Sequence, residues 1–147
     1  MSIKIVPGVV NNQKIQSVTE SMTVREAAKI MAKHHIGAVA VIKQDKLKGI
    51  LTERDLSVKI VAGGKDPDKI KVSQIMTKNP ETVGPDDSAT SALEKMRARG
   101  FRHLPVVDKD QIIGMVSVRD LYASAKSQLE DDLKDRDAFI FGTGYGG

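Results

Sequence analysis

A hydroxyl residue followed three positions later by an aspartate occurs twice in the chain, as Thr52 with Asp55 and as Ser117 with Asp120. Each pair stands where an apolar, strand-like segment gives way to a helix-like one, so the hydroxyl and the carboxylate can face one small cleft. A carboxylate there can accept two hydrogen bonds from a vicinal diol such as the 2′ and 3′ hydroxyls of ribose. The helix N-terminus and the hydroxyl favour phosphate oxygens. Compounds that contain adenosine meet both demands.

The same four residues also have a purely structural interpretation. Thr52 and Ser117 can cap the helices that follow them, and the two aspartates can offset the helix dipoles. One copy of the pattern would leave the two interpretations balanced. Its repetition favours ligand binding at one or both places.

The pattern belongs to a longer repeat. The strings GILTERDL and GMVSVRDL begin at Gly49 and Gly114, which are 65 residues apart (114 − 49 = 65). Two copies are too few for an open solenoid, which needs about three repeats, so we expect them to pack on each other as one pseudo-symmetric unit. The same offset aligns further identical residues without a gap: Val18 with Val83, Ala27 with Ala92, Met31 with Met96, Val41 with Val106, and Asp45 with Asp110.

Each copy is predicted to form strand, helix, strand, strand and helix. In copy one, Thr23 and Glu26 suggest a capping box at the start of an amphipathic helix. Two apolar segments then indicate a hairpin through the polar turn KQDK. We predict a strand over 16–18, a helix over 23–35, strands over 38–42 and 47–52, and a helix that starts near Glu53.

Copy two repeats this order after a linker. The segment AGGKDPDKIK, residues 62–71, is the clearest turn-rich linker, and VSQIM, residues 72–76, is expected to be a short helix that leads into copy two. The polar turn DKDQ separates the two middle strands of this copy. The predicted elements are a strand over 81–83, a helix capped by Ser88 that ends at Arg99, strands over 103–107 and 112–117, and a helix from Val118.

These patterns resemble the CBS domain, a family named after cystathionine β-synthase. The resemblance rests on the motif apolar-apolar-Gly-apolar-apolar-Ser/Thr-x-x-Asp after a strand carrying LPVVD, on the βαββα order and on the duplication. Two such motifs at this spacing are similar to a CBS pair, or Bateman module. The resemblance implies a mixed α/β (α+β) fold in which two βαββα repeats pack with pseudo-two-fold symmetry. It divides the chain into CBS domain 1 over 3–65, CBS domain 2 over 66–128, and a C-terminal helix extension with a glycine- and aromatic-rich tail over 129–147.

The resemblance also implies ligand-binding residues. In CBS pairs, basic residues at the place of Arg102 and His103 often reach the phosphates of a nucleotide in the central cleft; the alternative is a solvent-exposed pair where a strand begins. Copy one departs from this pattern, with Gly37 and Ala38 at the equivalent positions. Because the copies face each other, Arg102 or His103 can also serve a phosphate bound mainly by copy one. The further predicted ligand-binding residues are Arg54 and Arg119, which can instead pair with surface carboxylates, and Val18, Val83, Ile36, Phe101, Leu104 and Pro105.

No pattern supports catalysis, a metal site or thiol chemistry. The chain has no cysteine and three histidines, of which His34 and His35 end a predicted helix, where a protonated imidazole interacts well with the dipole. His-x-x-x-His spacing is absent, and no nucleophile stands beside a plausible base. We therefore expect a non-enzymatic protein without a catalytic cofactor. The longest apolar stretch, residues 36–42, is far shorter than the about 20 residues of a membrane span, so a soluble cytoplasmic protein is expected.

The C-terminal part departs from the repeat. After Asp120 the last helix is predicted to continue, with Leu121, Ala125, Leu129 and Leu133 four residues apart on one face. Such a stripe suits a partner helix, and we expect a homodimer. Glycine-rich chain ends are usually frayed. The aromatic residues of the segment 138–147 nevertheless suggest docking on a neighbouring subunit: Phe139, Phe141 and Tyr145.

The leading hypothesis is therefore a non-enzymatic sensor of adenine nucleotides. The sequence favours a stand-alone CBS pair that binds AMP, ADP or ATP, or alternatively S-adenosylmethionine or a dinucleotide, and transmits the ligand state to an unidentified partner protein. A second possibility is a ligand-free dimeric scaffold for protein association. A third is a basic nucleic-acid-binding module, suggested by the net charge of +4. We rank it last because the basic residues are dispersed and few aromatic residues are present to stack on bases.

Overall fold

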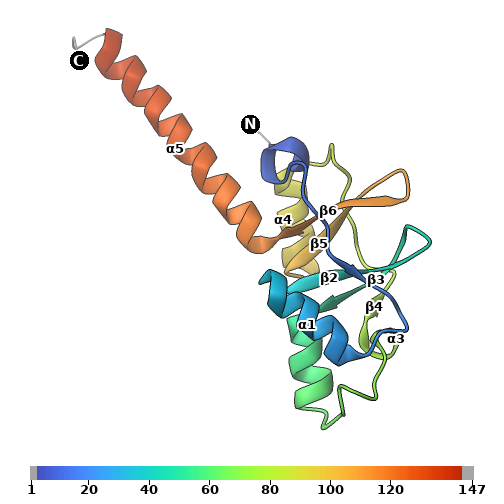
Figure 1. Cartoon of the computed structure of the whole chain (residues 1–147). Helices are drawn as coiled ribbons and strands as arrows, with labels where there is room; N and C mark the ends of the chain where they lie inside the picture. The colour runs from blue at the N-terminus through green and yellow to red at the C-terminus, as the bar shows by residue number, and fades with distance from the viewer. Residues whose placement is uncertain (1–2, 144–147) are drawn as a thin grey trace.

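One sheet joins the two copies within residues 3–143, the part of the chain that the computed structural model describes; side chains are described for residues 3–136. Its strand order is β1-β2-β3-β6-β5, with β4 paired to β3 (Figure 1). Only β1 and β2 pair in parallel; the other pairs in this sheet are antiparallel. The strands are β1 (Ser17–Val18), β2 (Ala38–Lys43), β3 (Lys46–Thr52), β4 (Thr77–Lys78), β5 (His103–Asp108) and β6 (Gln111–Ser117).

The two predicted hairpins are confirmed, and they have the same turn. Between β2 and β3 the φ angles of Gln44 and Asp45 are 52° and 63°, and between β5 and β6 those of Lys109 and Asp110 are 52° and 66°. Two consecutive residues of positive φ are characteristic of a type I′ turn, whose twist matches that of the flanking strands. The turns lie at the 65-residue offset (44 + 65 = 109). The hairpins join where β3 pairs with β6, which agrees with the predicted pseudo-two-fold symmetry.

Helix boundaries follow the predicted signals. The side-chain oxygen of Thr23 accepts a hydrogen bond from the Glu26 backbone N–H at 3.1 Å, which is one half of the predicted capping box. Ser88 caps the equivalent helix of copy two at 3.0 Å. Left-handed residues end both helices, namely His35 and Gly100. The helical elements are η1 (Ile5–Val9), α1 (Val24–His34), α2 (Glu53–Asp55), η2 (Leu56–Val61), α3 (Val72–Ile75), α4 (Ala89–Arg99) and α5 (Val118–Thr143).

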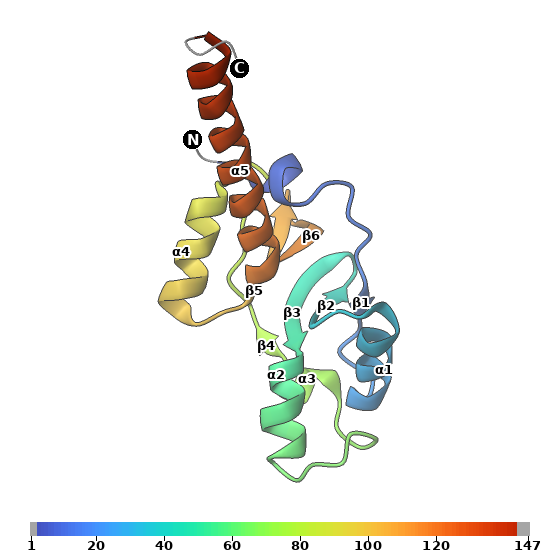
Figure 2. The same cartoon turned by 90° about the vertical axis from the view of Figure 1, so that its left-hand side faces the viewer.

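Each copy has its own hydrophobic core, and each core contains a segment from the start of the other copy. Ile5 is completely buried in the core of copy two. Val72 and Ile75 are buried in the core of copy one, and Ile70 packs against it. Since Ile70 is the equivalent of Ile5 (5 + 65 = 70), the two leading segments are exchanged. The longer helices stay with their own copy: in Figure 2, α1 and α2 lie with the first hairpin, and α4 and the start of α5 lie with the second.

The predicted strand over 81–83 is wrong. Val83 forms only an isolated parallel bridge with Val106, through hydrogen bonds to the neighbouring strand residues Pro105 and Val107. The strand cannot continue because Pro80 lies before the segment and the Gly84 N–H turns to the side chain of Asp87 at 2.7 Å. The structure instead has β4 over Thr77–Lys78. These two polar residues show no apolar alternation, so the sequence did not predict this strand.

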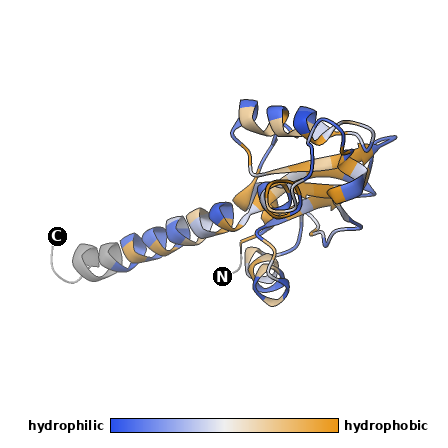
Figure 3. Ribbon diagram, turned by 90° about the horizontal axis from the view of Figure 1, so that it is seen from below, coloured by the Kyte–Doolittle hydropathy of each residue, from blue (hydrophilic) through white to orange (hydrophobic). Residues whose placement is uncertain are grey.

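The last helix, α5, leaves the body of the molecule (Figure 1). Of its predicted apolar stripe only Leu121 is buried, whereas Leu129 and Leu133 are 61% and 48% exposed. Figure 3 shows hydrophilic and hydrophobic residues mixed along this projecting part. The prediction for Phe139, Phe141 and Tyr145 lies outside the described side chains. No helix within residues 3–143 is long and apolar enough to cross a membrane.

Candidate functional site

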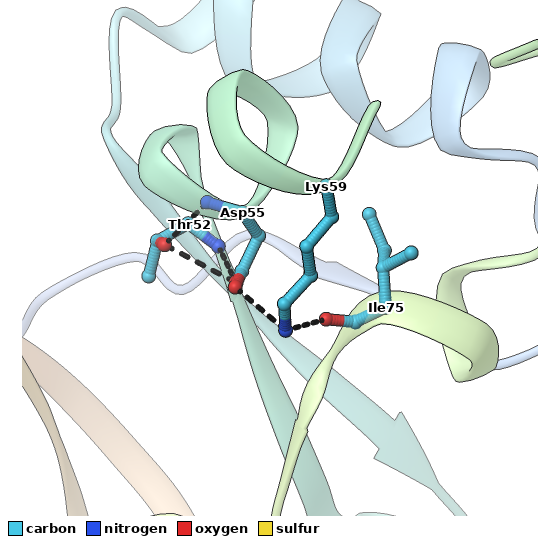
Figure 4. Close-up of polar contacts among 4 residues, drawn as sticks. All are labelled: Thr52, Asp55, Lys59 and Ile75. Atoms are coloured by element: carbon cyan, nitrogen blue, oxygen red, sulfur yellow. Dashed lines mark hydrogen bonds and ion pairs between the residues drawn. The ribbon is translucent and has the colours of Figure 1, made fainter. Parts of the chain in front are cut away.

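The first Thr-x-x-Asp pair lies where β3 ends and α2 begins. The backbone N–H of Thr52 donates a hydrogen bond to Asp55 Oδ2 at 2.9 Å, and the Thr52 hydroxyl contacts the same oxygen at 3.2 Å. In return the Asp55 backbone N–H donates to Thr52 Oγ1 at 3.2 Å. The two residues therefore form a reciprocal capping box (Figure 4).

The second pair forms the same box where β6 ends and α5 begins. The Ser117 N–H donates to Asp120 Oδ2 at 2.9 Å, and the Asp120 N–H donates to Ser117 Oγ at 3.0 Å. The structural interpretation of the motif is thus correct in both copies. It leaves room for ligand binding, because each box engages Oδ2 and each aspartate also lines a cleft.

Two clefts lie beside these aspartates. The first, which we name the Asp120 cleft, has a volume of about 600 Å³, and the second, the Asp55 cleft, of about 810 Å³. The Asp120 cleft is lined by 13–16, 35–38, Glu53, Arg102, His103, Met115 and 117–120. The Asp55 cleft is lined by Ile50, 52–55, 57–59, Thr77, Pro80, Glu81 and 99–103.

The linings of the two clefts correspond at the 65-residue offset. The loop 35–38 of the Asp120 cleft is equivalent to 100–103 of the Asp55 cleft, and the motif 117–120 is equivalent to 52–55. Each cleft therefore takes its aspartate from one copy and the facing loop from the other copy. Neither copy alone supplies a complete cleft.

Three residues belong to both clefts and form what we call the shared rim: Glu53, Arg102 and His103. Arg102 and Glu53 are exposed, whereas His103 is half-buried. Burial lowers the pKa of His103, the carboxylates of Glu53 and Asp120 oppose this shift, and Arg102 adds to it. His103 is therefore a neutral imidazole near pH 7, and Arg102 is the permanent cation of the rim.

The aspartates differ in their remaining partners. Lys59 Nζ lies 3.1 Å from Asp55 Oδ1 and donates a hydrogen bond to the Ile75 backbone oxygen at 2.7 Å (Figure 4). The equivalent position in copy two is Ser124 (59 + 65 = 124). Among residues 3–136, no ion pair involves Asp120.

The structure brings most of the predicted ligand-binding residues into the clefts. Four of them lie elsewhere: Val18, Val83 and Leu104 are at most 2% exposed in the two cores, and Pro105 is fully buried on β5. These four residues line neither cleft, so the structure does not bring them to the candidate site. The predicted residues that line a cleft are Thr52, Arg54, Asp55, Ser117, Arg119, Asp120, Arg102, His103, Ile36, Gly37, Ala38 and Phe101.

Sequence reasoning missed several cleft residues. Glu53 stands inside the repeated motif, and its equivalent in copy two is the apolar Val118, so the repeat gave no reason to single it out. Lys59 could have been found from its i,i+4 spacing to Asp55 on a helix. Gln13 could not have been found in this way, because its partner Met115 is 102 residues away in the sequence. The side-chain amide of Gln13 donates a hydrogen bond to the Met115 backbone oxygen and accepts one from the Met115 N–H.

Comparison with known proteins gives one consistent family. The family model described as CBS domain matches residues 8–62 and 72–126. The CBS domain-containing protein YhcV of Bacillus subtilis is 33% identical over 114 residues, which are 78% of this chain and 81% of that protein. The chain spans less of two matching proteins from Arabidopsis thaliana, 64% of one and 22% of the other.

Solved structures agree with this result. The CBS-domain containing protein ATU1752 from Agrobacterium tumefaciens is 30% identical, with a TM-score of 0.72 over 77% of this chain and 90% of that one. The CBS domain protein PAE2072 from Pyrobaculum aerophilum, solved in complex with AMP, is 28% identical, with a TM-score of 0.73 over 84% of this chain and 99% of that one. The chain therefore belongs to the CBS domain family and carries two CBS domains in tandem.

Proposed function

We propose that the chain is a non-enzymatic sensor that binds an adenine nucleotide in the clefts between its two CBS domains. The observation that carries this proposal is the construction of each cleft. An aspartate at a helix start in one copy faces a loop of the other copy, and Arg102 and His103 stand at the shared rim. The similarity to the Pyrobaculum aerophilum protein, whose structure contains AMP, supports the same class of ligand.

The lining of each cleft suits a nucleoside. The aspartate offers carboxylate oxygens to the ribose hydroxyls. Apolar residues at equivalent positions can cover the base: Ile15 and Ile36 in the Asp120 cleft, and Pro80 and Phe101 in the Asp55 cleft. An adenosine group placed in this way leaves its 5′ end free to reach the shared rim.

The shared rim suits a small number of phosphates. Arg102 presents a guanidinium that can bind phosphate oxygens in pairs, and the neutral imidazole of His103 can donate one hydrogen bond. Glu53 places a carboxylate at the same rim. Because the shared rim holds one permanent cation and one carboxylate, we favour AMP over ADP and ATP. S-adenosylmethionine and dinucleotides are the other adenosine-containing ligands to be tested.

The proposed sensor acts as a homodimer and signals to a partner protein. Its exposed large apolar residues support this part of the proposal, since such residues mark interaction surfaces when they gather on one face. Leu129 and Leu133 lie one helical turn apart on the projecting helix α5. The other exposed large apolar residues among those described are Val58, Val61, Leu93 and Tyr122.

A ligand-free scaffold for protein association is the second candidate. The observation in its favour is that reciprocal capping boxes account for both Ser/Thr-x-x-Asp motifs without any ligand. For the third candidate, nucleic-acid binding, the structure offers no comparable observation. The comparison that matters is therefore between a sensor and a scaffold.

A thermal-shift titration separates the two. A ligand present at 100 times its dissociation constant stabilises a fold by about 2.7 kcal/mol, which raises the melting temperature of a domain of this size by several degrees. We expect this shift with AMP and a smaller one with ATP, S-adenosylmethionine or a dinucleotide. GMP is the matched control for the base. Flat melting curves with every adenosine-containing ligand at millimolar concentration would favour the scaffold.

A further inference from the structure

A lysine already holds the aspartate of one cleft. Lys59, on η2, lies four residues after Asp55, and its ammonium group sits 3.1 Å from Asp55 Oδ1. The same group donates a hydrogen bond of 2.7 Å to the Ile75 backbone oxygen on α3, so it is fixed from two sides (Figure 4). The Asp55 side chain is only 12% exposed, which strengthens this charge-assisted contact.

Both oxygens of the Asp55 carboxylate are therefore engaged. Oδ2 accepts hydrogen bonds from Thr52, and Oδ1 faces the ammonium of Lys59. At Asp120 the capping box engages Oδ2 in the same way. Ser124 stands at the position equivalent to Lys59, and its short hydroxyl carries no charge. The two clefts have matching frameworks, but only Asp55 has a cation bound to it among the described residues.

We propose that Lys59 is an internal competitor for ribose, so that the two clefts are inequivalent and adenosine enters the Asp120 cleft first. This inference rests on the proposed function and deepens it. Ribose hydroxyls that approach Asp55 must compete with a charge-assisted bond, whereas those that approach Asp120 meet a carboxylate that has no ion pair among residues 3–136. A hydrogen bond to a charged group corresponds to about a ten- to hundredfold difference in affinity, and we expect the two clefts to differ by that factor.

Calorimetric titration with adenosine tests this directly. Adenosine is the right probe because it lacks phosphate, so the shared rim contributes little to the difference between the clefts. In the unmodified chain we expect one tight site per chain and one that is about ten- to hundredfold weaker. Lys59→Met should convert the weak site into a tight one. Adding Asp120→Ala to Lys59→Met should then leave a single tight site, which assigns the gained site to Asp55.

The equivalent position in copy two allows the reverse test, in which a lysine is added beside Asp120 instead of being removed from beside Asp55. Ser124→Lys places a lysine four residues after Asp120 and should weaken the tight site of the unmodified chain. It also keeps the inference testable if Lys59→Met does not fold. Lys69→Met removes the same charge from an exposed position outside both clefts and should leave both affinities unchanged.

The outcomes separate this inference from the proposed function. Two equivalent adenosine sites in the unmodified chain, or an unchanged weak site in Lys59→Met, would overturn the role of Lys59 while nucleotide binding stands. Failure of the unmodified chain and of every variant to bind either adenosine or AMP would overturn both.

Discussion

Lys46 of β3 pairs with Gln111 of β6 in the antiparallel bridge that joins the two hairpins. These residues are equivalent positions of the two copies (46 + 65 = 111), so the pseudo-two-fold axis passes between them. The axis relates the two clefts to each other, and the differences between the clefts therefore come from side chains. The facing loop carries Gly37 and Ala38 in the Asp120 cleft but Arg102 and His103 at the equivalent positions of the Asp55 cleft. The second main difference is Lys59, whose equivalent is Ser124.

Arg102 should act on both clefts, because it lines both. We expect Arg102→Ala to weaken AMP binding in each cleft about ten- to hundredfold, since a charge-assisted hydrogen bond to the phosphate is lost. Adenosine affinity should change little. Calorimetry with AMP and adenosine measures the two effects, and Arg97→Ala on the exposed face of α4 is the charge-matched control. An equal loss for adenosine would show that Arg102 does not act through phosphate.

The exchanged leading segment should contribute strongly to stability. Ile5 is completely buried in the core of copy two although it opens copy one. Ile5→Ala should lower the free energy of unfolding by about 2–5 kcal/mol, and Ile5→Val by about 0.5–1.5 kcal/mol, as expected for truncation of a packed core residue. Urea denaturation measures both variants. A cost of Ile5→Ala no greater than that of an ordinary surface change would contradict the exchange.

Local signals in the sequence predicted most of the fold. The 65-residue offset located both hairpins, and the hydroxyls of Thr23 and Ser88 marked two helix starts, because periodicity and capping depend on neighbours a few residues away. The strand over 81–83 failed because its apolar residue, Val83, is buried through a single bridge, which a burial pattern alone does not distinguish from a strand.

Features that depend on contacts between distant residues could not be predicted from the sequence. The burial of Ile5 in the other copy requires the three-dimensional packing of the two repeats. The aspartates and the basic pair of the rim were predicted because they belong to a repeated or family-typical pattern. Glu53 and Lys59 differ from their equivalents in copy two, Val118 and Ser124. Comparing the two copies therefore gave no reason to predict them as site residues, although both line a cleft.

His103 gives the stability of the protein a pH dependence. Burial is the main reason why its pKa in the folded chain lies below the ordinary value of about 6.5, although Glu53 and Asp120 oppose the shift. The unfolded chain therefore binds this proton more tightly than the folded chain. The free energy of unfolding that His103 contributes is fully present at pH values above its pKa in the unfolded chain. It is lost as the pH falls through that pKa toward the lower pKa of His103 in the folded chain.

The variant His103→Gln tests this sign. We expect it to lose less free energy of unfolding than the parent protein between about pH 7.5 and about pH 5.5, because glutamine takes up no proton in that range. Urea denaturation at both pH values provides the comparison. His34 and His35 are exposed and present in both proteins, so their contributions cancel. An equal or greater loss in the variant would contradict the assignment to His103.

Assembly through α5 is the remaining testable expectation. Leu129 and Leu133 are largely exposed in the single chain, one turn apart on the projecting helix. If a second copy covers them, changing both to aspartate should convert the dimer into a monomer, because association would bury unpaired charge. Light scattering measures the mass of each species.

Ser127→Asp combined with Lys134→Asp is the matched control for this change. At 100° per residue these positions lie on the opposite side of α5 from Leu129 and Leu133, and both are exposed. The control changes the charge by at least as much and should remain dimeric. A monomer in the unmodified chain would remove the premise, and a dimer that survives both leucine substitutions would place the interface elsewhere.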